Sequence, residues 1–199
     1  MATVNPVGNI APFINKQFVV SSEWWIYRDG VLHRGLDIST GANDILYSML
    51  TGHVLDKGNT TTAGNYIIIV DDILGSQTYG YATRYLHMRD SAVLPVGAAV
   101  QVGQAVGTEG ATGQGVTGIH LHLEMQDVSR FNWEWHFSDT QSDYINPCLF
   151  MGIENQQGTH WIYDGTPHPV ISEYDSHFPF VLYARKLRGE DEEQVNYDE

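Results

Sequence analysis

The sequence predicts a mainly β domain, in which short antiparallel strands are joined by glycine turns. Three observations support this fold class. Charged residues are few (17%) while aromatic residues are frequent (12%), and the chain contains 20 glycines. Several short segments alternate polar and apolar residues, whereas residues 23–126 contain no long 3.6-residue repeat. We therefore expect an antiparallel β-sheet with long loops around a groove and few helices.

The chain of 199 residues divides into four segments and is long enough for one domain with an apolar core. Residues 1–22 form an N-terminal segment with little pattern, and residues 23–150 form the main domain. Within that domain, residues 127–143 resemble an inserted loop rich in aromatic side chains. Residues 151–189 are expected to form a C-terminal extension that packs on the domain. Residues 190–199 form an acidic tail that we expect to be disordered.

Four regions of the main domain show strand patterns. Residues 66–70 form a β-branched run typical of a buried strand, and residues 83–87 alternate. Two further short strands are expected on either side of Gly103. Residues 120–125 alternate polar and apolar side chains strictly, which indicates a strand with one polar face.

Net charge and cysteine content exclude several functions. The formal charge of −14 argues against nucleic-acid binding and against electrostatic attachment to an anionic membrane. No segment is long and apolar enough to cross a membrane, and no signal peptide is visible at the N-terminus. Cys148 is the single cysteine, so a metal site has to use histidine and carboxylate ligands.

The segment from His33 to Asp37 is a candidate metal-binding element. The two residues are four apart with Gly35 between them, so their side chains can converge from an extended or turning backbone. Imidazole nitrogen and carboxylate oxygen both suit Zn²⁺. On its own this spacing is a weak indication, because it often arises by chance.

His120 and His122 form a second candidate pair. Residues two apart in a strand share a face, so both imidazoles should point the same way while Leu121 and Leu123 face the core. Two buried structural histidines, each with a hydrogen-bond partner, are an equally good interpretation of the pair alone. By the same parity, Glu124 should lie on the face of His122.

A third histidine, His87, follows Tyr85 and Leu86 in another predicted strand. A single histidine in a strand is more often structural than catalytic, so this segment carries little weight by itself. The alternation predicts that Tyr85 and His87 share one face.

Taken together, these segments resemble the lysostaphin-type (LytM-like) zinc metalloendopeptidases. That family shows His-x-Gly-x-Asp, then Gly-Asn before a strand, Tyr-x-His, a glycine-rich turn and His-Leu-His-x-Glu. The resemblance covers about residues 23–150, and the joint occurrence and order make it specific. The matching segments are residues 33–37, 64–69, 85–87, 107–113 and 117–124, with Asn146-Pro147 resembling the pair that closes the family's domain.

The resemblance implies that His33, Asp37 and His122 bind one Zn²⁺ per chain, and that His87 and His120 are the catalytic histidines. Three protein ligands leave a fourth position for water, as a catalytic zinc site requires. The bound water becomes a nucleophile near neutral pH, and the imidazoles can transfer its proton or stabilise the oxyanion. The sequence does not assign these two roles between His87 and His120.

Three further residues are candidates for substrate contact: Asn65, Tyr85 and Trp133. Asn65 follows Gly64 in the family pattern, where a structural role is also expected. Trp133 lies in the loop 127–143, which could wall a groove. Packing of that loop on the sheet is an equally good interpretation of its aromatic residues.

The predicted function is hydrolysis of peptide bonds in bacterial peptidoglycan, in a cross-bridge or a stem peptide. Peptidoglycan is the expected partner, with no role for nucleic acid or membrane. The expected setting is extracellular or virion-associated: a secreted wall lysin, or a bacteriophage tail lysin or endolysin. The scissile bond and the oligomeric state are not given by the sequence.

Two alternatives come from other classes of protein. The first is a non-catalytic domain of the same fold that binds the wall or regulates an amidase. The second is a cupin-like barrel that uses His120 and His122 for another metal. Cupins place their glutamate several residues further on than Glu124, which disfavours this second alternative.

Overall fold

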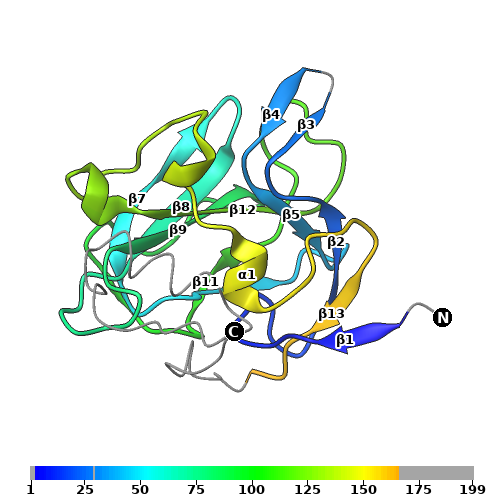
Figure 1. Cartoon of the computed structure of the whole chain (residues 1–199), viewed down its shortest axis with the longest axis horizontal. Coiled ribbons are helices and arrows are strands. Elements are labelled where there is room, and N and C mark those ends of the chain that lie inside the picture. Colours follow the sequence, from blue (N-terminus) through cyan, green and yellow to red (C-terminus); the bar gives the residue numbers. More distant parts are fainter. Residues whose placement is uncertain (1–2, 29, 166–199) are drawn as a thin grey trace, which may run out of the picture.

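A nine-stranded, mostly antiparallel sheet dominates the computed structural model, which describes residues 3–28 and 30–165 (Figure 1). The strands are β1 (Val4–Pro6), β2 (Gln17–Ser22), β3 (Ile26–Arg28), β4 (Val31–His33), β5 (Leu36–Ser39), β6 (Ile45–Tyr47), β7 (Gly52–Thr60), β8 (Gly64–Val70), β9 (Tyr81–Met88), β10 (Ala99–Val100), β11 (Ala105–Thr108), β12 (Leu121–Asp127) and β13 (His160–Ile162). The order in the large sheet is β1-β13-β2-β5-β12-β9-β8-β7-β10, while β3 pairs with β4 and β6 with β11. The predicted mainly β fold is confirmed.

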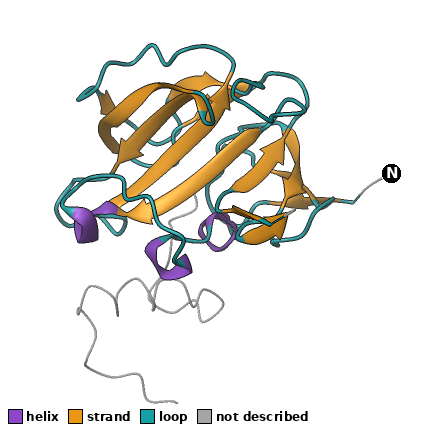
Figure 2. Ribbon diagram, turned by 90° about the horizontal axis from the view of Figure 1, so that it is seen from above, coloured by secondary structure: helices purple, strands orange, loops and turns teal. Residues whose placement is uncertain are grey.

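Helices are short in the described part of the chain and lie at the margin of the strands (Figure 2). They are η1 (Val128–Phe131), η2 (Gln141–Asp143) and α1 (Pro147–Met151). The Asn146 side chain accepts a hydrogen bond from the Cys148 backbone N–H, and Pro147 takes the first helical position, which are preferred ways to start a helix. Among the described residues, no helix has the length and apolar character needed to span a membrane.

One face of the sheet forms the apolar core, because neighbouring side chains in a strand point to opposite sides. Leu36 and Ile38 of β5 pair with Leu123 and Leu121 of β12, and all four are fully buried. The predicted inward orientation of Leu121 and Leu123 is therefore confirmed.

The opposite face carries polar side chains in register. His122 pairs with Asp37 on one side and with Leu86 on the other, and Glu124 pairs with Arg84. The strands β5, β12 and β9 lie side by side in the middle of the sheet (Figure 1). Because directly paired residues share a face, their side chains meet there.

The sheet includes strands from outside the predicted main domain, residues 23–150. β1 and β2 come from the predicted N-terminal segment 1–22, and Phe13 and Phe18 of that segment are buried in the core. β13, from the predicted extension 151–189, pairs with both β1 and β2. These parts are thus integral to the sheet. The rest of the extension from residue 166, and the predicted acidic tail 190–199, lie outside the described residues.

The predicted inserted loop, residues 127–143, covers part of the polar face. It folds into η1 and η2 and packs on a small apolar cluster of Ile68, Val70, Ala82 and Val128. Trp133 and Trp135 are the tryptophans of the loop that pack against this cluster.

Candidate metal centre and catalytic cleft

Three side chains converge at one point on the polar face of the sheet. His33 lies at the end of β4, Asp37 in β5 and His122 in β12. His33 Nε2 lies 3.0 Å from Asp37 Oδ1 and 3.0 Å from His122 Nδ1, and the last two atoms are 2.9 Å apart. The structure therefore brings together the three residues that the sequence resemblance implies as metal ligands.

The outer hydrogen bonds of the two histidines indicate which nitrogen faces the centre. His33 Nδ1 lies 2.8 Å from the Glu23 carbonyl oxygen and donates its proton there. His122 Nε2 lies 3.3 Å from Glu124 Oε1 and donates to that carboxylate. Each histidine thus turns its other ring nitrogen toward the Asp37 carboxylate, and the three potential ligand atoms lie so close together that a proton or a metal ion has to lie between them. Such an arrangement needs a cation.

A zinc-sized ion fits this donor set. Ligands bound to tetrahedral Zn²⁺ at about 2.0–2.2 Å lie roughly 3.3–3.6 Å from one another, so the spacing of 2.9–3.0 Å seen here has to widen only by about half an ångström. Two imidazoles and one carboxylate are also ordinary zinc ligands, and they leave a further position open. His33, Asp37 and His122 would hold the ion.

The pKa shifts of Asp37 and His122 also show that this site favours positive charge. Burial favours a higher pKa for Asp37, but hydrogen bonds to His122 and His33 outweigh burial and hold that pKa far below its ordinary value. Burial favours a lower pKa for His122, but hydrogen bonds to Asp37 and Glu124 raise it to about 9. A proton on His122 therefore balances the Asp37 charge in the protein alone, and a bound metal ion would replace that proton.

Gly35 allows this convergence. A Cβ atom at position 35 would lie only 2.3 Å from His122 Nε2, far inside van der Waals contact. The glycine between His33 and Asp37 is therefore required by the close approach of the His122 ring.

His87 and His120 lie beside the three ligands. The His87 and His120 ring centroids are 5.0 Å apart, and His87 is 5.6 Å from the His122 ring. Nδ1 of His87 donates to the Thr112 carbonyl and Nδ1 of His120 to the Gly118 carbonyl, each at 2.9 Å. Both histidines thus keep Nε2 available, and His120 Nε2 lies 3.7 Å from Asp37 Oδ1.

The environment keeps His87 neutral. Burial, together with the nearby charges of His122 and His120, lowers the pKa of His87 to about 4. A neutral imidazole with one free ring nitrogen can accept a proton at neutral pH. His87 also lines a cleft of about 400 Å³ that includes His33 and His122.

Tyr85 does not lie in this cleft. Its side chain is fully buried, and its hydroxyl accepts a hydrogen bond from the Met49 N–H at 2.9 Å. The expected shared face with His87 is absent because His87 has a left-handed backbone (φ 62°), which interrupts the strand alternation. The structure thus gives Tyr85 a supporting role in the core in place of the expected substrate contact.

Asn65 also has a structural environment. Its side-chain N–H groups donate to the Met88 and Arg89 carbonyls, both at 3.2 Å, and its side-chain oxygen accepts from Asn59 at 2.8 Å. The Asn65 side chain therefore connects β8 to the end of β9, which agrees with the structural role that was also expected for it. Trp133 is half-buried and packs edge-on against Tyr79.

Comparison with known proteins identifies the family. The model of Peptidase family M23 matches residues 31–147, which is more than half of the chain. The chain belongs to peptidase family M23. The peptidoglycan DD-endopeptidases ShyB and ShyA of Vibrio cholerae are similar to this M23 protein, with 37% identity over 95 residues and 36% over 93. These matches cover 48% and 47% of the chain but only 20% of each relative, so the chain spans about a fifth of their length.

Solved structures show the same fold. The catalytic domain of lysostaphin from Staphylococcus simulans has 21% identity and a TM-score of 0.50, with 69% of this chain and 92% of that domain covered. The catalytic domain of EnpA from Enterococcus faecalis has 22% identity and a TM-score of 0.50, and the match covers 69% of this chain and 95% of that domain. This fold excludes the cupin-like alternative.

The sequence pattern did not reveal a buried ion pair next to the metal centre. Glu124 Oε2 accepts a hydrogen bond from Arg84 Nη1 at 3.0 Å, while Glu124 Oε1 accepts the one from His122. Burial favours a higher pKa for Glu124, but the His122 hydrogen bond and the charges of His122 and Arg84 lower it to about 2. Glu124 therefore stays ionised and orients the His122 ring. The alternation of the strand predicted that Glu124 lies near His122, but no sequence pattern indicated that Arg84 pairs with Glu124.

Proposed function

We propose that this M23 protein is a zinc-dependent endopeptidase that hydrolyses peptide bonds in bacterial peptidoglycan. The observation that carries the proposal is the convergence of three potential metal-ligand atoms beside two further histidines with a free nitrogen each. A single Zn²⁺ per chain would act as a Lewis acid and lower the pKa of water at this site.

The protein's own residues supply the remaining chemistry. Of His87 and His120, one imidazole accepts the proton of the attacking water. That proton, held on Nε2, can be returned to the leaving amine, and the other imidazole, when protonated on Nε2, donates a hydrogen bond to the developing oxyanion. Their hydrogen bonds to the Thr112 and Gly118 carbonyls fix both rings, so no reorganisation is needed as charge develops.

Peptidoglycan is proposed as the substrate because the Vibrio cholerae relatives are named peptidoglycan DD-endopeptidases. The site of action is then the cell wall. Delivery by secretion or by a virion remains a prediction from the sequence, as does the choice between cross-bridge and stem peptide.

A non-catalytic wall-binding or amidase-regulating role is the second candidate. A chain of the SpoIIIAH and SpoIIQ complex shares the fold at 16% identity and a TM-score of 0.52, and fold alone does not decide between catalysis and binding. A regulatory domain has no need of metal ligands or of two adjacent histidines. The complete set found here favours hydrolysis.

The test combines metal analysis with an activity assay on the purified protein. Mass spectrometry should find about one zinc per chain, and new amino groups should appear when the protein is mixed with purified peptidoglycan. A chelator should abolish that release, and zinc should restore it. Zinc binding without hydrolysis of any peptidoglycan type would support the regulatory role, and absence of zinc from the folded protein would refute the proposal.

A further inference from the structure

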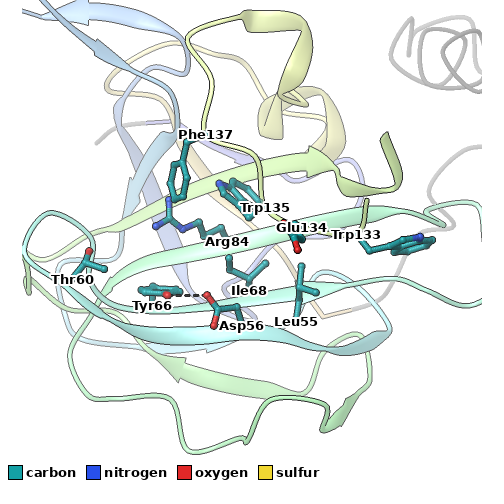
Figure 3. A pocket seen from close by; sticks show the side chains of 10 residues that line it. All are labelled: Leu55, Asp56, Thr60, Tyr66, Ile68, Arg84, Trp133, Glu134, Trp135 and Phe137. Atoms are coloured by element: carbon teal, nitrogen blue, oxygen red, sulfur yellow. Dashed lines mark hydrogen bonds between the residues drawn. The ribbon is translucent and has the colours of Figure 1, made fainter. Parts of the chain in front are cut away.

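A second pocket of about 380 Å³ opens beside the catalytic cleft (Figure 3). Thr60, Arg84 and Phe137 line both spaces, so the pocket continues the cleft along the polar face of the sheet. A peptide bound at the metal centre could therefore place a neighbouring side chain in this pocket.

Four of its ten lining residues are aromatic. Tyr66 comes from β8, whereas Trp133, Trp135 and Phe137 come from the loop 127–143 (Figure 3). Trp133 and Trp135 pack on the small apolar cluster beneath the loop, so their rings are held in place before any ligand binds. The Arg84 guanidinium lies over three of these four rings, so they already hold one cation and offer the ligand mainly apolar contact.

Two carboxylates give the pocket its charge. Asp56 projects from β7 and Glu134 from the loop, so they approach the pocket from opposite sides, and both residues are exposed (Figure 3). The Tyr66 hydroxyl donates a hydrogen bond to Asp56 Oδ2 at 2.8 Å, which orients that carboxylate.

Arg84 does not cancel this negative charge. Its guanidinium group already pairs with the buried Glu124 carboxylate at 3.0 Å and lies 5.0–5.6 Å from the rings of Tyr66, Trp135 and Phe137. The Arg84–Glu124 pair is neutral as a unit, so Asp56 and Glu134 set the sign of the pocket. An anionic ligand group is thereby disfavoured and a cationic one favoured.

Building on the proposed function, we propose that this pocket is a subsite for the primary ammonium group of a diamino-acid residue in the peptide substrate. The aromatic walls pack against the alkyl stem, and Asp56 and Glu134 receive charge-assisted hydrogen bonds from the ammonium group. The subsite would make recognition depend on a free side-chain amine next to the scissile bond.

The test measures binding rather than turnover. The probes are a short peptide with one free lysine-type side-chain amine and the same peptide with that amine acetylated. Binding is followed through the indole N–H signals of Trp133 and Trp135 in NMR titrations of the full chain. The free amine should shift these signals and bind at least about tenfold more tightly than the acetylated form.

Variants identify the groups responsible. The double variant Asp56→Asn/Glu134→Gln should lose the preference for the free amine, because both negative charges are gone. The matched control Asp72→Asn/Glu154→Gln removes two exposed carboxylates outside the pocket and should keep the preference. Thermal unfolding of each variant checks that the fold is intact.

Two outcomes would overturn the inference. One is equal affinity of wild-type protein for the two peptides; the other is a glycan fragment shifting both indole signals while the amine peptide shifts neither. Because binding is measured without hydrolysis, these outcomes are separate from failure of the proposed function, which would appear as zinc-independent or absent cleavage of peptidoglycan.

Discussion

Replacing Gly35 with alanine tests whether the approach of the His122 ring defines the metal site. The new methyl carbon would lie 2.3 Å from His122 Nε2, whereas ordinary contact begins near 3.4 Å, so ring and backbone must separate by about 1 Å. The His122 ring has little freedom, because Glu124 lies 3.3 Å from one nitrogen and Asp37 2.9 Å from the other. Gly35 itself does not have a left-handed backbone, so the effect would be purely steric.

A shift of that size is large for a metal site, where ligand distances are held to about 0.2 Å. We expect zinc affinity to fall by at least about 10- to 100-fold, as when the support of a ligand is lost. Overpacking should also cost roughly 1–3 kcal/mol of unfolding free energy.

The assay is a competition titration of zinc against a chromophoric chelator, with thermal unfolding recorded with and without zinc. Gly118→Ala is the matched control, because its added Cβ would meet no atom within 4 Å and its backbone is not left-handed. If Gly35→Ala bound zinc within about threefold of wild type, the steric reasoning about the His122 ring would be refuted.

Three further predictions concern the site and the core. His122→Ala should lose zinc and activity together, whereas His87→Ala and His120→Ala should keep zinc and lose most turnover, as metal analysis and kcat measurements would show. Glu124→Gln should weaken zinc binding by about 10- to 100-fold in the same titration, because it weakens the orientation of His122. Burial raises the pKa of Cys148 to about 12, so at pH 8 a thiol reagent should label the native protein at least about a thousandfold more slowly than the unfolded chain.

Each of these predictions has a contradicting outcome. Loss of zinc in His120→Ala would show that the ligand has been assigned to the wrong member of the His120–His122 pair. Unchanged zinc affinity in Glu124→Gln would remove the orienting role of that carboxylate. Because the native state keeps the Cys148 thiol protonated, its contribution to stability is complete below pH 9 and is lost as pH rises toward 12. Rapid labelling at pH 8 without unfolding would contradict that environment.

The sheet was predictable from local patterns, and the ligand set from the resemblance of the ordered motifs to the lysostaphin-type family. Strict alternation around His122 placed Leu121 and Leu123 in the core and left the histidine on the polar face, as the structure has it. The order of the motifs then implied that His33 and Asp37 meet His122 in space.

Other features depend on contacts between distant segments. The strands β1 and β13 have three residues each and pair across more than 150 positions, so no local pattern marks them. The ion pair of Arg84 with Glu124 joins residues 40 positions apart and depends on the register of β9 against β12. The orientation of Tyr85 was misjudged because alternation assumes regular backbone, which ends at His87.

At position 87 the residue that suits the left-handed backbone differs from the residue that suits catalysis. A non-glycine residue in this conformation costs of order 1–3 kcal/mol, which the surrounding strands have to outweigh. Glycine at position 87 would relieve that strain but would remove the imidazole as well. Selection for a more robust chain would thus favour loss of the histidine, and its retention in evolving or engineered variants would report that catalysis is under selection.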